Sequence, residues 1–88
     1  MLYSKGDLSM CPTAFVMINA EIGEEKAVLK FLTEELSIDE AHVVYGVYDL
    51  VAKISANDMK SLKDTVINKI RQANGVRSTL TMVIVRGK

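Results

Sequence analysis

The chain has 88 residues, of which 49% are hydrophobic and 25% charged, and this is the size and composition of one small globular domain. Its eleven Lys and Arg balance eleven Asp and Glu, and a zero formal charge argues against direct binding to nucleic acid. No apolar stretch approaches the length of a membrane span, and the first dozen residues lack the apolar region of a signal peptide.

The first half of the chain predicts a strand followed by a helix. Residues 1–12 are expected to form a flexible tail, and residues 13–86 form the domain. Residues 13–20, TAFVMINA, are a short apolar run rich in branched and aromatic side chains, which is typical of a strand. Residues 24–36 place apolar side chains at intervals of three and four, with acids at the start, and this pattern predicts an amphipathic helix.

The stretch 43–55, VVYGVYDLVAKIS, favours β-structure but contains Gly46 and Asp49 at its middle. Glycine can adopt positive φ at little steric cost, and aspartate is common at turn edges. We therefore expect residues 37–40 to be a linker and the stretch itself to be two strands joined by a tight hairpin at Gly46.

The second half of the chain repeats the helix and strand. Asn57 or Asp58 can cap a helix whose apolar stripe includes Leu62 and Val66, and Asn74-Gly75 predicts a left-handed stop. Residues 76–85, VRSTLTMVIV, predict the last strand. The order β-α-β-β-α-β indicates an α+β, ferredoxin-like fold, in which two helices cover one face of a four-stranded antiparallel sheet.

The predicted strands are apolar on both faces. In the first strand Val16 and Ile18 point one way while Phe15 and Met17 point the other, and the third and fourth strands follow the same pattern. Two helices can cover only one of these faces. We expect the other face to pack against a second copy in a homodimer, because a small monomer rarely exposes so large an apolar surface.

Several ferredoxin-like functions are excluded by missing residues. Cys11 is the only cysteine, so the chain has no paired metal-binding thiols and no intrachain disulfide, which fits a reducing cytoplasm. The aromatic ladder of an RNA-recognition motif is also missing. His42 has no acid or cysteine at ligand or triad spacing, so its role is expected to be structural. We predict no catalytic residue, no metal site and no cofactor.

Two groups of residues remain as candidates for a site. Gly46, Val47, Tyr48 and Asp49 lie in the predicted hairpin, and Thr79 and Thr81 share one face of the last strand. Asp49 can also simply bond to turn amides, and β-branched threonine suits a strand for steric reasons. From the residue types alone, both groups keep a structural interpretation beside the functional one.

Together, YGVYDLVAKI, a helix and ANGVRSTLTMVIV resemble the effector-binding domain of the Lrp/AsnC, or feast/famine, transcription regulators. That domain has a βαββαβ fold, a Gly-x-aromatic-Asp hairpin and a closing strand written Gly-Val-x-x-Thr-x-Thr. Gly46, Tyr48 and Asp49 match the first motif. Gly75, Val76, Thr79 and Thr81 match the second. The family's regulators carry an N-terminal helix-turn-helix domain, for which the residues before the first strand are too few, so the chain looks like a stand-alone effector domain.

The resemblance implies a function and a site. It implies a homodimer formed through the sheets, dimers assembled into a higher oligomer such as an octamer-like ring, and an amino acid or similar effector in the cleft between dimers. Amides around Gly46 and Val47 and the hydroxyls of Thr79 and Thr81 would bind the carboxylate, and Asp49 would bind the ammonium group. A full-length Lrp/AsnC regulator is a further expected partner, while direct contact with nucleic acid or a membrane is not.

Two other functions stay open. An enzyme of the dimeric ferredoxin-like barrel type would use the apolar sheet as a pocket wall, although His42, Tyr45 and Tyr48 make no convincing catalytic set. A purely structural interaction module would dock its sheet on a different protein. Assays of turnover and of oligomer size with and without amino acids separate these functions.

Overall fold

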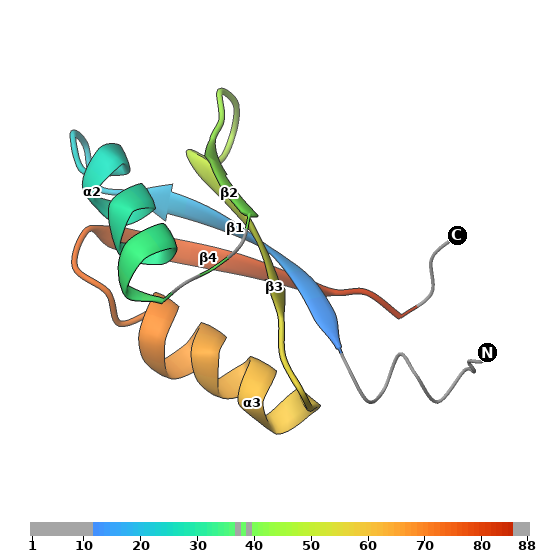
Figure 1. Ribbon diagram of the computed structural model, residues 1–88. Coiled ribbons are helices and arrows are strands. Elements are labelled where there is room, and N and C mark those ends of the chain that lie inside the picture. The colour runs from blue at the N-terminus through green and yellow to red at the C-terminus, as the bar shows by residue number, and fades with distance from the viewer. Residues whose placement is uncertain (1–11, 37, 39, 86–88) are drawn as a thin grey trace.

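The computed structural model describes residues 12–36, 38 and 40–85 of the chain (Figure 1). Within these residues the elements follow the expected order. The strands are β1 (Thr13–Ala20), β2 (Glu40–Val43), β3 (Leu50–Ser55) and β4 (Val76–Val83). The helices are α2 (Glu25–Lys30) and α3 (Met59–Asp64), and each continues as a wider π-helical segment, η1 (Phe31–Glu35) and η2 (Thr65–Ile70).

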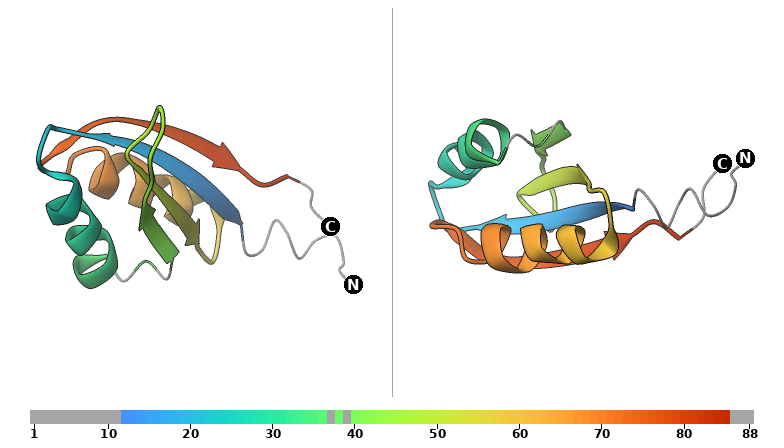
Figure 2. Two further views of the ribbon diagram at one scale, coloured as in Figure 1. Left: turned by 90° about the horizontal axis from the view of Figure 1, so that it is seen from above. Right: turned by 60° about the horizontal axis from the view of Figure 1, so that its bottom comes forward.

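The strands form one antiparallel sheet in the order β2-β3-β1-β4, so β1 lies in the interior and β4 forms one edge. Both helices pack on the same face of this sheet (Figure 2). The predicted ferredoxin-like fold is therefore confirmed. In the described part of the chain, no helix is both long enough and apolar enough to cross a membrane.

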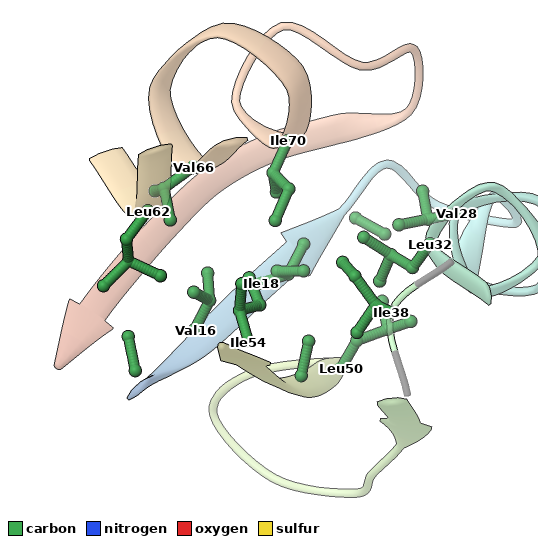
Figure 3. Packing of buried hydrophobic residues seen from close by; sticks show 13 residues of the cluster. Val16, Ile18, Val28, Leu32, Ile38, Leu50, Ile54, Leu62, Val66 and Ile70 are labelled. Carbon is green, nitrogen blue, oxygen red and sulfur yellow. The ribbon is translucent and has the colours of Figure 1, made fainter. Parts of the chain in front are cut away.

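The core lies between the sheet and the two helices (Figure 3). On β1 the alternate residues Ala14, Val16 and Ile18 are fully buried, and the register places them opposite Ile54, Ala52 and Leu50 of β3. The helices contribute residues spaced by four along one side: Val28, Leu32, Leu62, Val66 and Ile70. The alternation read from the sequence thus predicts the buried face of each central strand.

The opposite face of the sheet is also apolar, and no helix covers it. Phe15 pairs with Met82, and Met17 pairs with both Leu80 and Val51. Leu80 and Met82 retain 45% and 47% of their accessible surface. We call these five residues the open face. The prediction that the sheet is apolar on two sides is confirmed.

The expectation of a tight hairpin at Gly46 is wrong. Strand β2 ends at Val43 and β3 begins at Leu50, and the loop closes through the Val44 N–H, which donates to the Asp49 carbonyl at 2.8 Å. Residues 45–48 therefore form a wider tip. Gly46 also has no positive φ, and an added Cβ would meet nothing within 4 Å, so no local geometry requires a glycine there.

Pro12, the last residue assigned to the tail, contacts the domain. It is buried, and its carbonyl accepts a hydrogen bond from the Ala56 N–H at 3.1 Å. The remaining residues assigned to the tail, 1–11, lie outside the described residues, as does residue 86 at the end of the predicted domain.

Between the two candidate caps of the second helix, the structure selects Asp58. Its backbone is extended (φ −150°, ψ 171°), and its Oδ1 accepts the Ser61 N–H at 2.7 Å. This bond satisfies one of the free amides of the first helical turn and favours the ionised carboxylate, so the pKa of Asp58 lies below its ordinary value of 3.8. At the other end the helix stops earlier than predicted, because Arg71 is already its C-cap residue, and Gly75, with φ +89°, lies in the turn that leads into β4.

The Asp58 cap predicts a loss of stability in acid. Because the folded-state pKa is lowered, the carboxylate stabilises the fold above the ordinary value of 3.8, and this contribution disappears as the pH falls through the lower folded value. Asp58→Asn keeps an acceptor that does not titrate, so its free energy of unfolding should fall less steeply with acid than that of the wild type. Urea denaturation from about pH 2 to 5 measures this, with Asp64→Asn as the control for lost charge. Equal slopes for Asp58→Asn and the wild type would contradict it.

Candidate ligand-binding site

The tip of the β2–β3 hairpin is solvent-exposed and apolar. Tyr45 and Val47 are fully or almost fully exposed, at 106% and 87%, while Tyr48 is partly buried. Among the described residues, no other two large apolar side chains with a single residue between them are as exposed as Tyr45 and Val47. Exposed apolar side chains of this size commonly mark a contact with a partner or ligand. The hairpin tip is therefore a surface available for contact.

Asp49 anchors the hairpin to the central strand. Its backbone N–H donates to the Ile18 carbonyl at 2.9 Å, and its carboxylate Oδ2 accepts the Ala20 N–H at 2.9 Å. The paired register of β1 and β3 ends at Ile18 and Leu50, so the Asp49 side chain satisfies the Ala20 amide where the regular ladder has stopped. The carboxylate bonds to an amide of β1 instead of the turn amides that the sequence suggested.

Thr79 and Thr81 lie on the helix-covered face of β4. The register places them opposite Ile18 and Val16, whose side chains point into the core. Both threonines line a groove of about 560 Å³ between β4 and the α3–η2 helix. The other lining residues are Leu62, Lys63, Val66, Ile67, Arg71 and Val83. The groove combines an apolar floor with hydroxyl and cationic groups, as ligand-binding clefts commonly do.

The structure does not bring the two candidate groups together in one protomer. Strand β1 separates them, because Ile18 pairs with Leu50 on one side and with Thr79 on the other. Two strand spacings, roughly 10 Å, therefore lie between the start of β3 and Thr79. None of Gly46, Val47, Tyr48 and Asp49 lines the groove. The six predicted residues form two half-sites, which we call the hairpin and the β4 groove.

Lys63, Ile67 and Arg71 line the β4 groove but were not among the predicted site residues. Their spacing of four residues places them along one side of the helix, next to the buried stripe, and this periodicity was visible in the sequence. What the sequence did not give was which edge strand that side faces.

His42 has an exposed side chain and an acidic neighbour that the sequence analysis did not anticipate. The side chain is 60% exposed, and its Nε2 lies 3.5 Å from Glu40 Oε2 on the same strand. The described residues contain no cluster of three or more His, Cys, Asp or Glu side chains able to hold a metal ion.

These features define a ferredoxin-like domain with a groove beside its edge strand. Residues 13–87 match the Lrp/AsnC ligand binding domain, and the chain belongs to this family. It is 32% identical over 79 residues to the HTH-type transcriptional regulator PF0250 of Pyrococcus furiosus, a match that covers 86% of this chain and 53% of the relative. The chain thus spans about half the length of that curated relative.

Solved structures agree with this assignment. TTHA0845 from Thermus thermophilus superposes with a TM-score of 0.80 at 32% identity, over 88% of this chain and 96% of that one. The transcriptional regulator NMB0573 of Neisseria meningitidis, solved as its L-Met complex, shares the fold with a TM-score of 0.76 at 12% identity, over 98% of this chain and 57% of that one.

Loss of the hydrogen bond between Asp49 and β1 should lower the stability of the fold. A study of ligand binding by Asp49 variants must therefore measure stability and affinity separately. Asp49→Ala leaves the partly buried Ala20 amide without its acceptor and should lower the free energy of unfolding by about 1 to 3 kcal/mol. Asp49→Asn keeps an acceptor oxygen and should cost less. Urea denaturation at one fixed protein concentration measures both. Equal loss in the two variants would mean that this hydrogen bond is not what the aspartate contributes.

Proposed function

We propose that this domain senses an amino acid or a similar small molecule in the cytoplasm and responds by changing its assembly, with itself or with a full-length Lrp/AsnC regulator. The effector lies between protomers, held by the hairpin of one copy and the β4 groove of another. The domain acts in regulation and catalyses no reaction.

One observation carries this proposal: the two half-sites lie on opposite sides of β1. A ligand of amino-acid size cannot contact both within one chain, because the hairpin does not line the groove. The exposed tip, with Tyr45 and Val47, is available to reach a neighbouring copy. Family membership supports a small-molecule effector, and the L-Met complex of NMB0573 is an example of an amino acid bound on this fold.

An amino acid needs hydrogen-bond donors for its carboxylate and an acceptor for its ammonium group. We assign the donors to the amides around Gly46 and Val47 and to the hydroxyls of Thr79 and Thr81. Asp49 supplies the acceptor. A carboxylate has two oxygens with several lone pairs, so the bond from Asp49 to the Ala20 amide leaves capacity for a ligand.

The open face supports the proposed assembly. Phe15, Met17 and Val51 are only partly buried, and Leu80 and Met82 are about half exposed. Packing two such faces together removes this apolar surface from water and forms a twofold dimer. Dimers would then associate through the half-sites into a ring such as an octamer. A ligand that binds only the assembled form, at about 100 times its dissociation constant, would favour that form by about 2.7 kcal/mol per site.

The ligand proposal predicts that Asp49→Asn loses amino-acid binding. This variant removes the charge that pairs with the ammonium group while it keeps the structural hydrogen bond. Affinity for whichever amino acid binds the wild type should fall by at least about tenfold, as expected for losing a charge-assisted hydrogen bond. Calorimetry over a panel of amino acids measures affinity, and native mass spectrometry reports assembly and bound mass together.

Asp64→Asn is the matched control, because it removes the same charge from α3, away from the hairpin. It should bind the amino acid with wild-type affinity. Unchanged affinity in Asp49→Asn would remove Asp49 from the site. If no amino acid changed the oligomer, a structural interaction module would be the better description, and turnover of small substrates would instead indicate a barrel-type enzyme.

The dimer proposal predicts that charges on the open face separate the protomers. Leu80→Lys combined with Met82→Lys places two cations on the surface that would be buried in the dimer. Each fully buried apolar side chain contributes about 1.5 to 3 kcal/mol, so the dissociation constant of the dimer should rise at least about tenfold. Light scattering over a dilution series measures this, and Ile22→Lys, at a residue that is 94% exposed, is the control. A double variant as dimeric as the wild type would exclude this face as the interface.

A further inference from the structure

A second hollow adjoins the β4 groove at the end of the helix. It has a volume of about 230 Å³ and is lined by Arg71, Gln72, Val76, Arg77, Ser78 and Thr79. Arg71 and Thr79 line the groove as well, so the two depressions meet at these residues. The hollow and groove together form one path between the helix and the edge strand β4, with a polar end and an apolar end.

A β-bulge sets the position of Arg77 in this hollow. Asn19 pairs with Ser78 while Ala20 pairs with Val76, which leaves Arg77 without a partner on β1. An extra residue of this kind bends the strand and re-aims the side chain, and bulges are common beside functional sites. Here the bulge brings Arg77 to the same hollow as Arg71, although the two side chains come from different elements.

The charges lining both depressions have one sign. Lys63, Arg71 and Arg77 contribute cationic groups, and among the described residues that line either depression there is no Asp or Glu. No described acid lies within ion-pair distance of either arginine. Guanidinium groups bind carboxylates in a bidentate geometry, and nearby apolar walls strengthen the attraction. This wall is therefore suited to an anion and not to an ammonium group.

We propose that Arg71 and Arg77 form an anion subsite that holds the carboxylate of a ligand whose aliphatic body lies in the β4 groove. Thr79 donates its hydroxyl at the junction, and the body extends over Ile67 and Val83 toward Thr81. Thr79 and Thr81 are about 7 Å apart along the strand, a length comparable to a short aliphatic chain. The ligand class is an aliphatic carboxylate, whose amino group contributes little at this wall.

This inference rests on the proposed function only in taking the groove as the ligand site, and it adds groups that bind the carboxylate. In the proposed function, amides of a neighbouring hairpin contact the carboxylate together with the threonines. In the present inference the arginines of the groove supply further donors, from the same protomer as the threonines. An aliphatic acid without an amino group should then bind to a single chain, independently of the hairpin.

Matched probes test the assignment. Isocaproate is leucine without its amino group, and isoamylamine is leucine without its carboxylate. We expect isocaproate to bind the wild type and to shift the amide resonances of Thr79 and Ile67 in NMR titrations at fixed ionic strength. Isoamylamine should bind at least about tenfold more weakly. Inorganic phosphate should compete weakly, and phosphate binding tighter than isocaproate would overturn the carboxylate assignment.

Substitutions test which cationic residues bind the carboxylate. Arg71→Gln combined with Arg77→Gln should raise the dissociation constant of isocaproate at least about tenfold, while Lys69→Gln, on the same helix but lining neither depression, should leave it unchanged. Failure of isocaproate to bind the wild type would overturn the proposal. So would equal binding of the amine, an unaffected arginine variant, or an equal loss in Lys69→Gln, which would indicate non-specific attraction.

The same measurements distinguish this proposal from the proposed function. If Asp49→Asn no longer assembled in response to leucine but still bound isocaproate, both the proposed function and the anion subsite would be supported. If an amino acid drives assembly, and its binding requires Asp49 but not the arginines, the proposed function stands and the anion subsite is overturned. Isocaproate binding that depends on the arginines, with no amino acid altering the oligomer, would keep the subsite and remove the assembly function.

Discussion

The burial of one face of β1 is the constraint on which the rest of the molecule depends. Ala14, Val16 and Ile18 are fully buried beneath the helices, and the strand has a hydrogen-bonded neighbour on each side. Because successive side chains in a strand point to opposite faces, burial of these residues forces Phe15 and Met17 onto the other face. The open apolar face is thus a direct consequence of a central strand that is apolar at every position from 14 to 18.

The position of β1 also explains why the candidate site is divided. A residue next to the start of β3 and a residue on β4 are separated by the width of β1, because β1 lies between these two strands. Asp49 is tied to that strand by two hydrogen bonds, so the base of the hairpin cannot move toward β4 without breaking them. The same fold therefore keeps the two groups of candidate residues apart within one chain. In the proposed assembly, self-association would both cover the open face and join these two groups.

The sequence was sufficient for the elements, the topology and the buried faces, because each of these depends on local periodicity. It was insufficient for the hairpin, since the Asp49 carboxylate at the base of the wider loop accepts a long-range hydrogen bond from the Ala20 N–H, about thirty residues earlier in the chain. It was also insufficient for the groove. Lys63 and Arg71 carry a visible helical spacing, but that they line one groove with Thr79 depends on a tertiary contact, and the bulge at Arg77 is revealed only by the strand register.

The formal charge of the whole chain does not describe the local charge around the β4 groove. A formal charge of zero argues against binding to the long phosphate backbone of nucleic acid, which rewards a continuous basic surface. It says nothing about a small anion, which requires only two or three cations converging on one hollow. Acids and bases alternate along both helices, as with Glu25 and Lys26 on the first and Lys63 and Asp64 on the second. The described charged residues that line the β4 groove and the adjoining hollow are nevertheless all cations, from the second helical segment, its C-cap and the last strand. A neutral domain can thus present a locally cationic surface.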